Sequence, residues 1–176
     1  FQAERYGWHV DPAHVHSVSD VLKVLEIYLD YFVRPGGAVI LPTPAYMPFF
    51  EVPPAHGRQI IEVPCREQDG FYALDLDGIE SAFRAGGAVL VLCNPYNPVG
   101  RVHTREELEA VCALVDRYDG RVFADEIHAP LTYPDSPAHI PYASISEVAA
   151  GHPMTGTSAS TAVHLPGFQF AAAIVG

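Results

Sequence analysis

Short and largely apolar runs alternate with amphipathic stretches along this chain, and this alternation restricts its fold more than any other feature. The apolar runs lie at residues 38–41, 59–63, 88–93 and 121–124, where Pro, Gly or acidic residues bound them. Strands that are apolar on both faces are typical of a mainly parallel sheet that helices cover on both sides. We therefore predict an α/β fold, a three-layer sandwich with a mainly parallel sheet.

Three amphipathic helices are expected, one before these strands and two between them. The first covers residues 19–32, with Ser19 as its cap, and the second covers residues 75–83. The third begins at Thr104, where the sequence Thr-Arg-Glu-Glu forms a capping box, and continues to residue 118. The second and the third helix each follow one strand and precede the next, so right-handed crossovers are expected.

Composition indicates a globular protein and disfavours several classes of partner. The chain has 176 residues, of which 49% are apolar and 18% charged, so we expect one domain over residues 1–176. The net charge of −11 disfavours nucleic acid and anionic membrane surfaces as partners. No apolar run approaches the roughly 20 residues of a membrane-spanning helix. Three widely spaced cysteines in apolar runs suggest neither a disulfide framework nor a zinc site, which fits a cytoplasmic protein.

Both ends of the chain suggest a piece of something longer. The sequence begins without Met and stops on an apolar, strand-like run at residues 171–176. We expect either an internal segment of a longer polypeptide or a truncated relic of one.

Polar and aromatic residues follow three of the predicted strands. Tyr46 follows the first, Asn97 lies in the segment 94–100 after the third, and Asp125 and His128 follow the fourth. Ligands of open α/β sheets gather beyond the carboxyl ends of the strands. Each residue alone is also compatible with turn formation or packing, so the hypothesis of a site rests on their combination.

Together with residues 5–12, 42–49, 139–144 and 158–160, these segments resemble the fold-type I pyridoxal-phosphate enzymes of the class I/II aminotransferase family. The closer resemblance is to the cystathionine β-lyase (C-S lyase) branch, and it runs in order along essentially the whole chain. It implies the cofactor-binding large domain, without the N-terminal segment and the small C-terminal domain that family members also have. It also implies a homodimer or a partner chain, because such sites lie at a dimer interface.

The resemblance implies a role for each residue at the strand ends. Asp125 matches the carboxylate that keeps the pyridine nitrogen protonated. Asn97 matches the amide donor to the phenolate oxygen of the cofactor, and His128 occupies a position near that oxygen. Tyr46 matches the aromatic ring that stacks on the pyridine face.

The phosphate of the cofactor would lie at the start of the first helix, where free backbone N–H groups favour an anion. The candidates are Ser19 and Asp20, with Ser158 adding a hydroxyl. Asp20 suits this role only if its amide faces the ligand and its carboxylate does not.

One departure from the family pattern decides the functional interpretation. Thr161 stands where family members have the lysine that holds the cofactor as a Schiff base. The only lysine of the chain is Lys23, which the helical pattern places beside Glu26 on a polar, solvated face. A threonine hydroxyl cannot form an imine and is too weak a base for an α-proton. We therefore expect noncovalent binding of pyridoxal phosphate and little or no turnover of an amino-acid substrate.

Three interpretations stay open. The preferred one is the large-domain segment of a C-S lyase or aminotransferase-like protein that keeps most of its cofactor site. The second is a degenerate, non-catalytic module that pairs with another chain. The third is a cofactor-free enzyme that reuses Asp125, His128 and His164.

Overall fold

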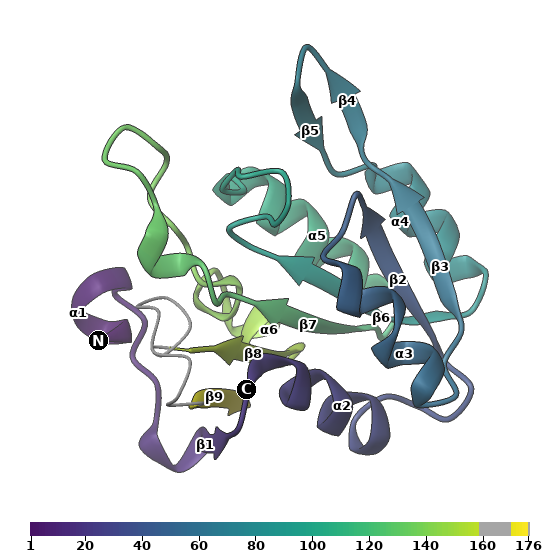
Figure 1. Ribbon diagram of the computed structural model, residues 1–176, viewed down its shortest axis with the longest axis horizontal. Helices are drawn as coiled ribbons and strands as arrows, with labels where there is room; N and C mark the ends of the chain where they lie inside the picture. Colours follow the sequence, from purple (N-terminus) through teal and green to yellow (C-terminus); the bar gives the residue numbers. More distant parts are fainter. Residues whose placement is uncertain (159–169, 176) are drawn as a thin grey trace.

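A seven-stranded sheet forms the centre of the computed structural model, which describes residues 1–158 and 170–175 (Figure 1). Its strand order is β1-β9-β8-β7-β6-β2-β3. The strands are β1 (Val15–Val18), β2 (Ala38–Thr43), β3 (Ile60–Pro64), β6 (Gly87–Cys93), β7 (Arg121–Asp125), β8 (Pro153–Thr157) and β9 (Ala171–Val175). The five strands from β8 to β3 are parallel neighbours, whereas β9 pairs antiparallel with both β8 and β1. The expectation of a mainly parallel sheet is confirmed.

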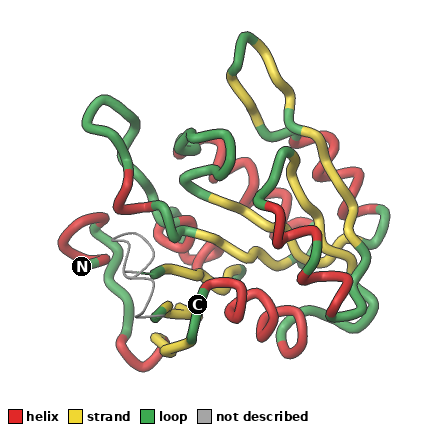
Figure 2. The backbone as a smooth tube through the Cα atoms, in the orientation of Figure 1, coloured by secondary structure: helices red, strands yellow, loops and turns green. Residues whose placement is uncertain are grey.

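Helices cover both faces of the sheet (Figures 1 and 2). They are α1 (Gln2–Tyr6), α2 (Val21–Tyr31), α3 (Val52–Ala55), α4 (Leu76–Arg84), α5 (Arg105–Arg117) and α6 (Glu147–Ala150). Four 3₁₀ turns lie at Pro12–His14, Met47–Phe50, Ala129–Leu131 and Tyr142–Ser144. A separate hairpin, β4 (Arg66–Gln68) and β5 (Phe71–Ala73), projects from one end of the sheet.

The core is divided into two apolar layers by the sheet, as a three-layer sandwich requires. Because neighbouring side chains of a strand point to opposite faces, Val39 and Leu41 of β2 pack with α2, whereas Ile40 between them packs with α4. Each of these three residues is at most 1% exposed. The continuous apolar runs of the sequence arise from this burial on both faces.

The helix ends follow the sequence closely, with one correction. The capping box of α5 is present, because Thr104 Oγ1 accepts from Glu107 N and the Glu107 carboxylate accepts from Thr104 N. The cap of α2, however, is Asp20, whose carboxylate accepts from Lys23 N at 2.8 Å. The prediction of Ser19 as cap was therefore wrong by one residue. No helix in residues 1–158 is long and apolar enough to cross a membrane.

Candidate functional site

Three neighbouring strands bring the candidate residues to one edge of the sheet. In the strand order, β6 lies between β2 and β7, and all three are parallel. Cys93 at the end of β6 pairs in register with Asp125 at the end of β7. The loops that carry Tyr46, Asn97 and His128 therefore leave the sheet at the same carboxyl edge.

Asp125 and Asn97 lie on either side of the Cys93 thiol. Cys93 Sγ is 3.8 Å from Asp125 Oδ2, and the backbone N–H of Asn97 donates to the same sulfur at 3.4 Å. Asp125 Oδ1 accepts from Ile127 N at 3.2 Å. Burial raises the pKa of the Asp125 carboxyl to about 6, and these few hydrogen bonds offset the burial only in part. The carboxylate thus lacks a positive partner among the residues that contact it.

A cavity of about 510 Å³ opens beside Asn97 and His128. Its lining also includes Phe71 of the hairpin and Leu131 and Tyr133 of the segment that follows β7. Burial lowers the pKa of His128, which favours the neutral imidazole. The structure therefore brings Asn97 and His128 to one shared hollow, and Asp125 is joined to Asn97 through Cys93.

Tyr46 lies at the same edge but does not line this cavity. Its ring is 42% exposed and meets the edge of Phe49 at a centroid distance of 5.7 Å. Phe49 and Asn97 both line a smaller hollow of about 10 Å³. Phe49 thus contacts Tyr46 and shares this smaller hollow with Asn97.

The predicted phosphate site contains an anion of the protein itself. The Asp20 carboxylate covers the start of α2, and Ser19 Oγ donates to it at 3.1 Å. Ser158 Oγ donates to the carbonyl oxygen of Phe170 at 2.8 Å. A carboxylate at this helix start would repel a phosphate, so the role of Ser19 and Asp20 in phosphate binding stays a prediction.

Two expectations concern lysine chemistry. Lys23 is exposed on α2 and forms an ion pair with Glu26, which confirms its predicted placement on the polar face. Thr161 and His164 lie outside the described residues.

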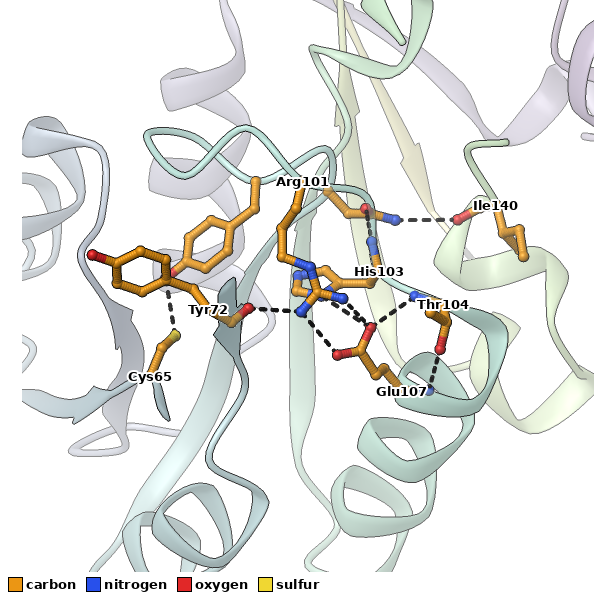
Figure 3. Close-up of polar contacts among 9 residues, drawn as sticks. Cys65, Tyr72, Arg101, His103, Thr104, Glu107 and Ile140 are labelled. Atoms are coloured by element: carbon orange, nitrogen blue, oxygen red, sulfur yellow. Dashed lines mark hydrogen bonds and ion pairs between the residues drawn. The ribbon is translucent and has the colours of Figure 1, made fainter. Parts of the chain in front are cut away.

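Two polar pairs near the site were not singled out from the sequence. Glu126, next to Asp125, is buried with His139: its Oε2 is 3.3 Å from His139 Nε2, and its Oε1 accepts from Tyr142 N at 2.8 Å. In the sequence, only the family resemblance of residues 139–144 could have drawn attention to this first pair, Glu126 and His139. Arg101 forms a two-pronged contact with Glu107 and donates to the carbonyl oxygen of Tyr72 (Figure 3). Within residues 1–158 and 170–175, no group of three His, Cys, Asp or Glu residues could hold a metal ion.

Comparison with known proteins decides the family. Residues 5–175 match the family model of the class I and II aminotransferases. The chain belongs to this family. It lies near the C-S lyase branch, because it is 39% identical to the cystathionine β-lyase of Corynebacterium glutamicum and 33% identical to the cystathionine β-lyase PatB of Bacillus subtilis. Each match covers 97% of this chain but only 44% of the relative.

A solved structure agrees with the family. The crystal structure of cystalysin from Treponema denticola, which contains a pyridoxal 5′-phosphate cofactor, superposes with a TM-score of 0.94 at 30% identity. The superposition covers 99% of this chain and 44% of cystalysin. The described sheet and helices thus have the fold of the matching part of cystalysin. This chain spans less than half the length of the relatives that it matches.

Proposed function

We propose that this chain binds pyridoxal phosphate noncovalently at the carboxyl edge of the sheet, as the large-domain segment of a C-S lyase or aminotransferase-like protein that acts on amino acids. One observation carries the proposal: the carboxyl of Asp125 is buried, has a pKa raised to about 6, and contacts no cationic group. A carboxylate in such a place is stabilised by a cation brought by a ligand. A protonated pyridine nitrogen is a cation of the right kind.

The other residues of the edge fit the same ligand. The Asn97 amide can donate a hydrogen bond to a phenolate oxygen, and the His128 imidazole lines the same cavity. Tyr46 is 42% exposed, and its aromatic ring is of the kind on which a planar ring can stack. The pyridoxal ring supplies an electron sink for bonds at the α-carbon of an amino acid. The part of Asp125 in that chemistry is to hold a proton on the ring nitrogen.

Thr161 limits what the site can do. A hydroxyl does not bind the cofactor covalently and does not remove an α-proton at neutral pH. We therefore propose that turnover is absent or very slow. The alternative is a non-catalytic module that pairs with another chain, either a second copy or a partner that supplies missing parts. We also propose that the chain is one domain over residues 1–176 and acts in the cytoplasm.

A titration with pyridoxal phosphate, followed by absorbance, tests the proposal. We expect saturable and reversible binding, and no adduct after borohydride reduction and mass measurement, because Lys23 is the only lysine and faces solvent. Asp125→Ala should weaken binding at least tenfold. Asp77→Ala, which removes an exposed carboxylate, should leave binding unchanged.

Two outcomes would contradict this function. Absence of saturable binding would refute the cofactor site, and a stable adduct on Lys23 would refute the noncovalent mode. The variant Thr161→Lys gives a constructive check, because it should convert reversible binding into a bond that borohydride makes permanent.

A further inference from the structure

We propose that the cavity beside Asn97 and His128 binds the group that is attached to the sulfur of a cysteine-derived ligand. It should prefer an uncharged apolar group to one that carries a second ammonium and carboxylate, as cystathionine does. This inference rests on the proposed function, since it assigns the cavity to the substrate of the same site. It goes beyond that function by naming the chemistry of the group that the cavity holds.

The size and position of the cavity suit this role. Its volume of about 510 Å³ is within the usual range for small-molecule sites. Asn97 and His128, the residues proposed to face the cofactor ring, are among its lining residues. A group that extends from an amino acid held at the cofactor would enter the cavity beside these two residues.

Large apolar side chains that are partly exposed also line the cavity. They are Phe71 at the tip of the hairpin and Leu131 and Tyr133 in the segment after β7. These three side chains are 56%, 53% and 81% exposed. Large apolar side chains that stay exposed around a hollow mark a place where an apolar partner can be buried.

The cavity wall has no free charge in the described part of the chain. Arg101 is its only lining Lys, Arg, Asp or Glu, and Glu107 neutralises it through both guanidinium Nη atoms. The guanidinium also lies 4.4 Å from the centre of the Phe71 ring. Its remaining nitrogen, Nε, has no partner but is covered by protein atoms, so a ligand cannot reach it. Figure 3 shows Arg101 turned toward Glu107 and the Tyr72 carbonyl.

This arrangement discriminates between two kinds of ligand. The second amino-acid end of cystathionine carries an ammonium and a carboxylate, and burying either without a partner is costly. A benzyl or alkyl group instead gains from contact with Phe71, Leu131 and Tyr133. The cavity should therefore favour S-benzyl-L-cysteine over L-cystathionine.

Calorimetry on the full chain loaded with pyridoxal phosphate tests this preference. We expect S-benzyl-L-cysteine to bind at least tenfold more tightly than L-cystathionine, with S-methyl-L-cysteine between them. Equal affinities, or tighter binding of cystathionine, would overturn the inference while leaving the cofactor site intact.

Two variants and a control locate the effect in the cavity. Tyr133→Ala should weaken the binding of S-benzyl-L-cysteine by about three- to tenfold, the usual effect of one aromatic contact. It should not weaken the binding of cystathionine. Leu131→Arg should lower the ratio of the affinity for S-benzyl-L-cysteine to that for L-cystathionine at least fivefold, because the arginine supplies a cation for the second carboxylate of cystathionine. Tyr31→Ala removes an equally exposed tyrosine (79%) from α2 and should change neither affinity. Equal effects of Tyr133→Ala and Tyr31→Ala would refute the assignment.

The failure of the proposed function is a separate result. Absorbance of the loaded chain and of each variant reports pyridoxal phosphate binding independently of the amino-acid ligands. If the cofactor does not bind, the proposed function fails, and the same two ligands are compared on the chain alone. A preference for the benzyl ligand there, lost in Tyr133→Ala, would support the cavity assignment, and no preference would overturn it.

Discussion

Asp125 combines deep burial with a negative charge that no side chain balances. Its ordinary pKa in an unfolded chain is about 3.9, and burial raises the pKa in the folded state to about 6. The folded state therefore binds the proton more tightly than the unfolded state. Between these two pKa values, stability falls as the pH rises, because ionisation is easier in the unfolded chain.

The variant Asp125→Asn removes the free-energy cost of holding an ionised carboxylate in the protein interior. Relative to the unmodified chain, the variant should gain up to about 3 kcal/mol in unfolding free energy between pH 4 and pH 7.5, since each pKa unit corresponds to about 1.4 kcal/mol. Urea denaturation without cofactor at a series of pH values measures this gain. Asp77→Asn, at a carboxylate that is 86% exposed, is the control and should show no such trend. Parallel pH profiles for Asp125→Asn and the unmodified chain would contradict the prediction.

Among the elements, helix α5 begins with a carboxylate that serves several partners. Burial alone would raise the pKa of Glu107, but contacts from His103 and Arg101 and the N–H of Thr104 outweigh burial and lower this pKa to about 2. Because the folded pKa is depressed, the stabilisation is complete above the unfolded value near 4.3 and is lost as the pH falls toward 2. The same carboxylate holds Arg101 in the cavity wall.

Glu107→Gln should therefore destabilise the chain by roughly 2–3 kcal/mol at pH 7, and the difference should shrink as the pH falls from 4.5 to 2.5. Glu109→Gln on the same helix is the matched control, because Glu109 is 55% exposed and 3.8 Å from Arg105. Chemical denaturation at pH 7 and pH 3 measures both variants. If Glu107→Gln and Glu109→Gln lower the unfolding free energy equally at pH 7, the stabilising role of the Glu107 carboxylate is refuted.

The elements that the sequence predicts well are those whose signals are local. The capping box of α5 lies within four residues, and the apolar run of β6 is buried on both faces, so both were expected. The hairpin at 66–73 was missed, although Asp69 and Gly70 both have positive φ and form the kind of Asp-Gly turn that joins two strands. A search for that dipeptide would have found it.

Strand β8 could not be found in this way, because its burial is tertiary. Its sequence, Pro-Met-Thr-Gly-Thr, has one large apolar residue and owes its place to pairing with β7 and β9. Gly156 is needed there because a Cβ atom would come within 2.7 Å of Val21 on α2. For the candidate site, the rule of strand ends indicated Asn97, Asp125 and His128. The contact of Cys93 with Asp125 and that of Arg101 with the Tyr72 carbonyl join residues about 30 positions apart in the sequence and carry no local signal.

At the scale of the whole molecule, one sheet separates two apolar layers, and Phe123 of β7 lies at the centre of the layer shared with α2. Its side chain is fully buried, contacts Phe49 edge to face at a ring distance of 6.1 Å, and stands two residues before Asp125. A cavity at this point removes contacts between the sheet, α2 and the segment that carries Tyr46. The chain cannot close that cavity from the other layer, because the sheet lies between them.

Phe123→Ala should therefore cost about 3–5 kcal/mol of unfolding free energy, which is a large share of the 5–15 kcal/mol that holds a typical domain folded. Phe1→Ala, at a phenylalanine that is 65% exposed, should cost less than about 1 kcal/mol. Urea denaturation followed by the fluorescence of the single tryptophan, Trp8, and by circular dichroism measures both variants. Coincident transitions would show that the two layers unfold together. A loss below about 1 kcal/mol for Phe123→Ala would mean that the α2 layer does not depend on this contact, and the arrangement of the carboxyl edge would then need a different support.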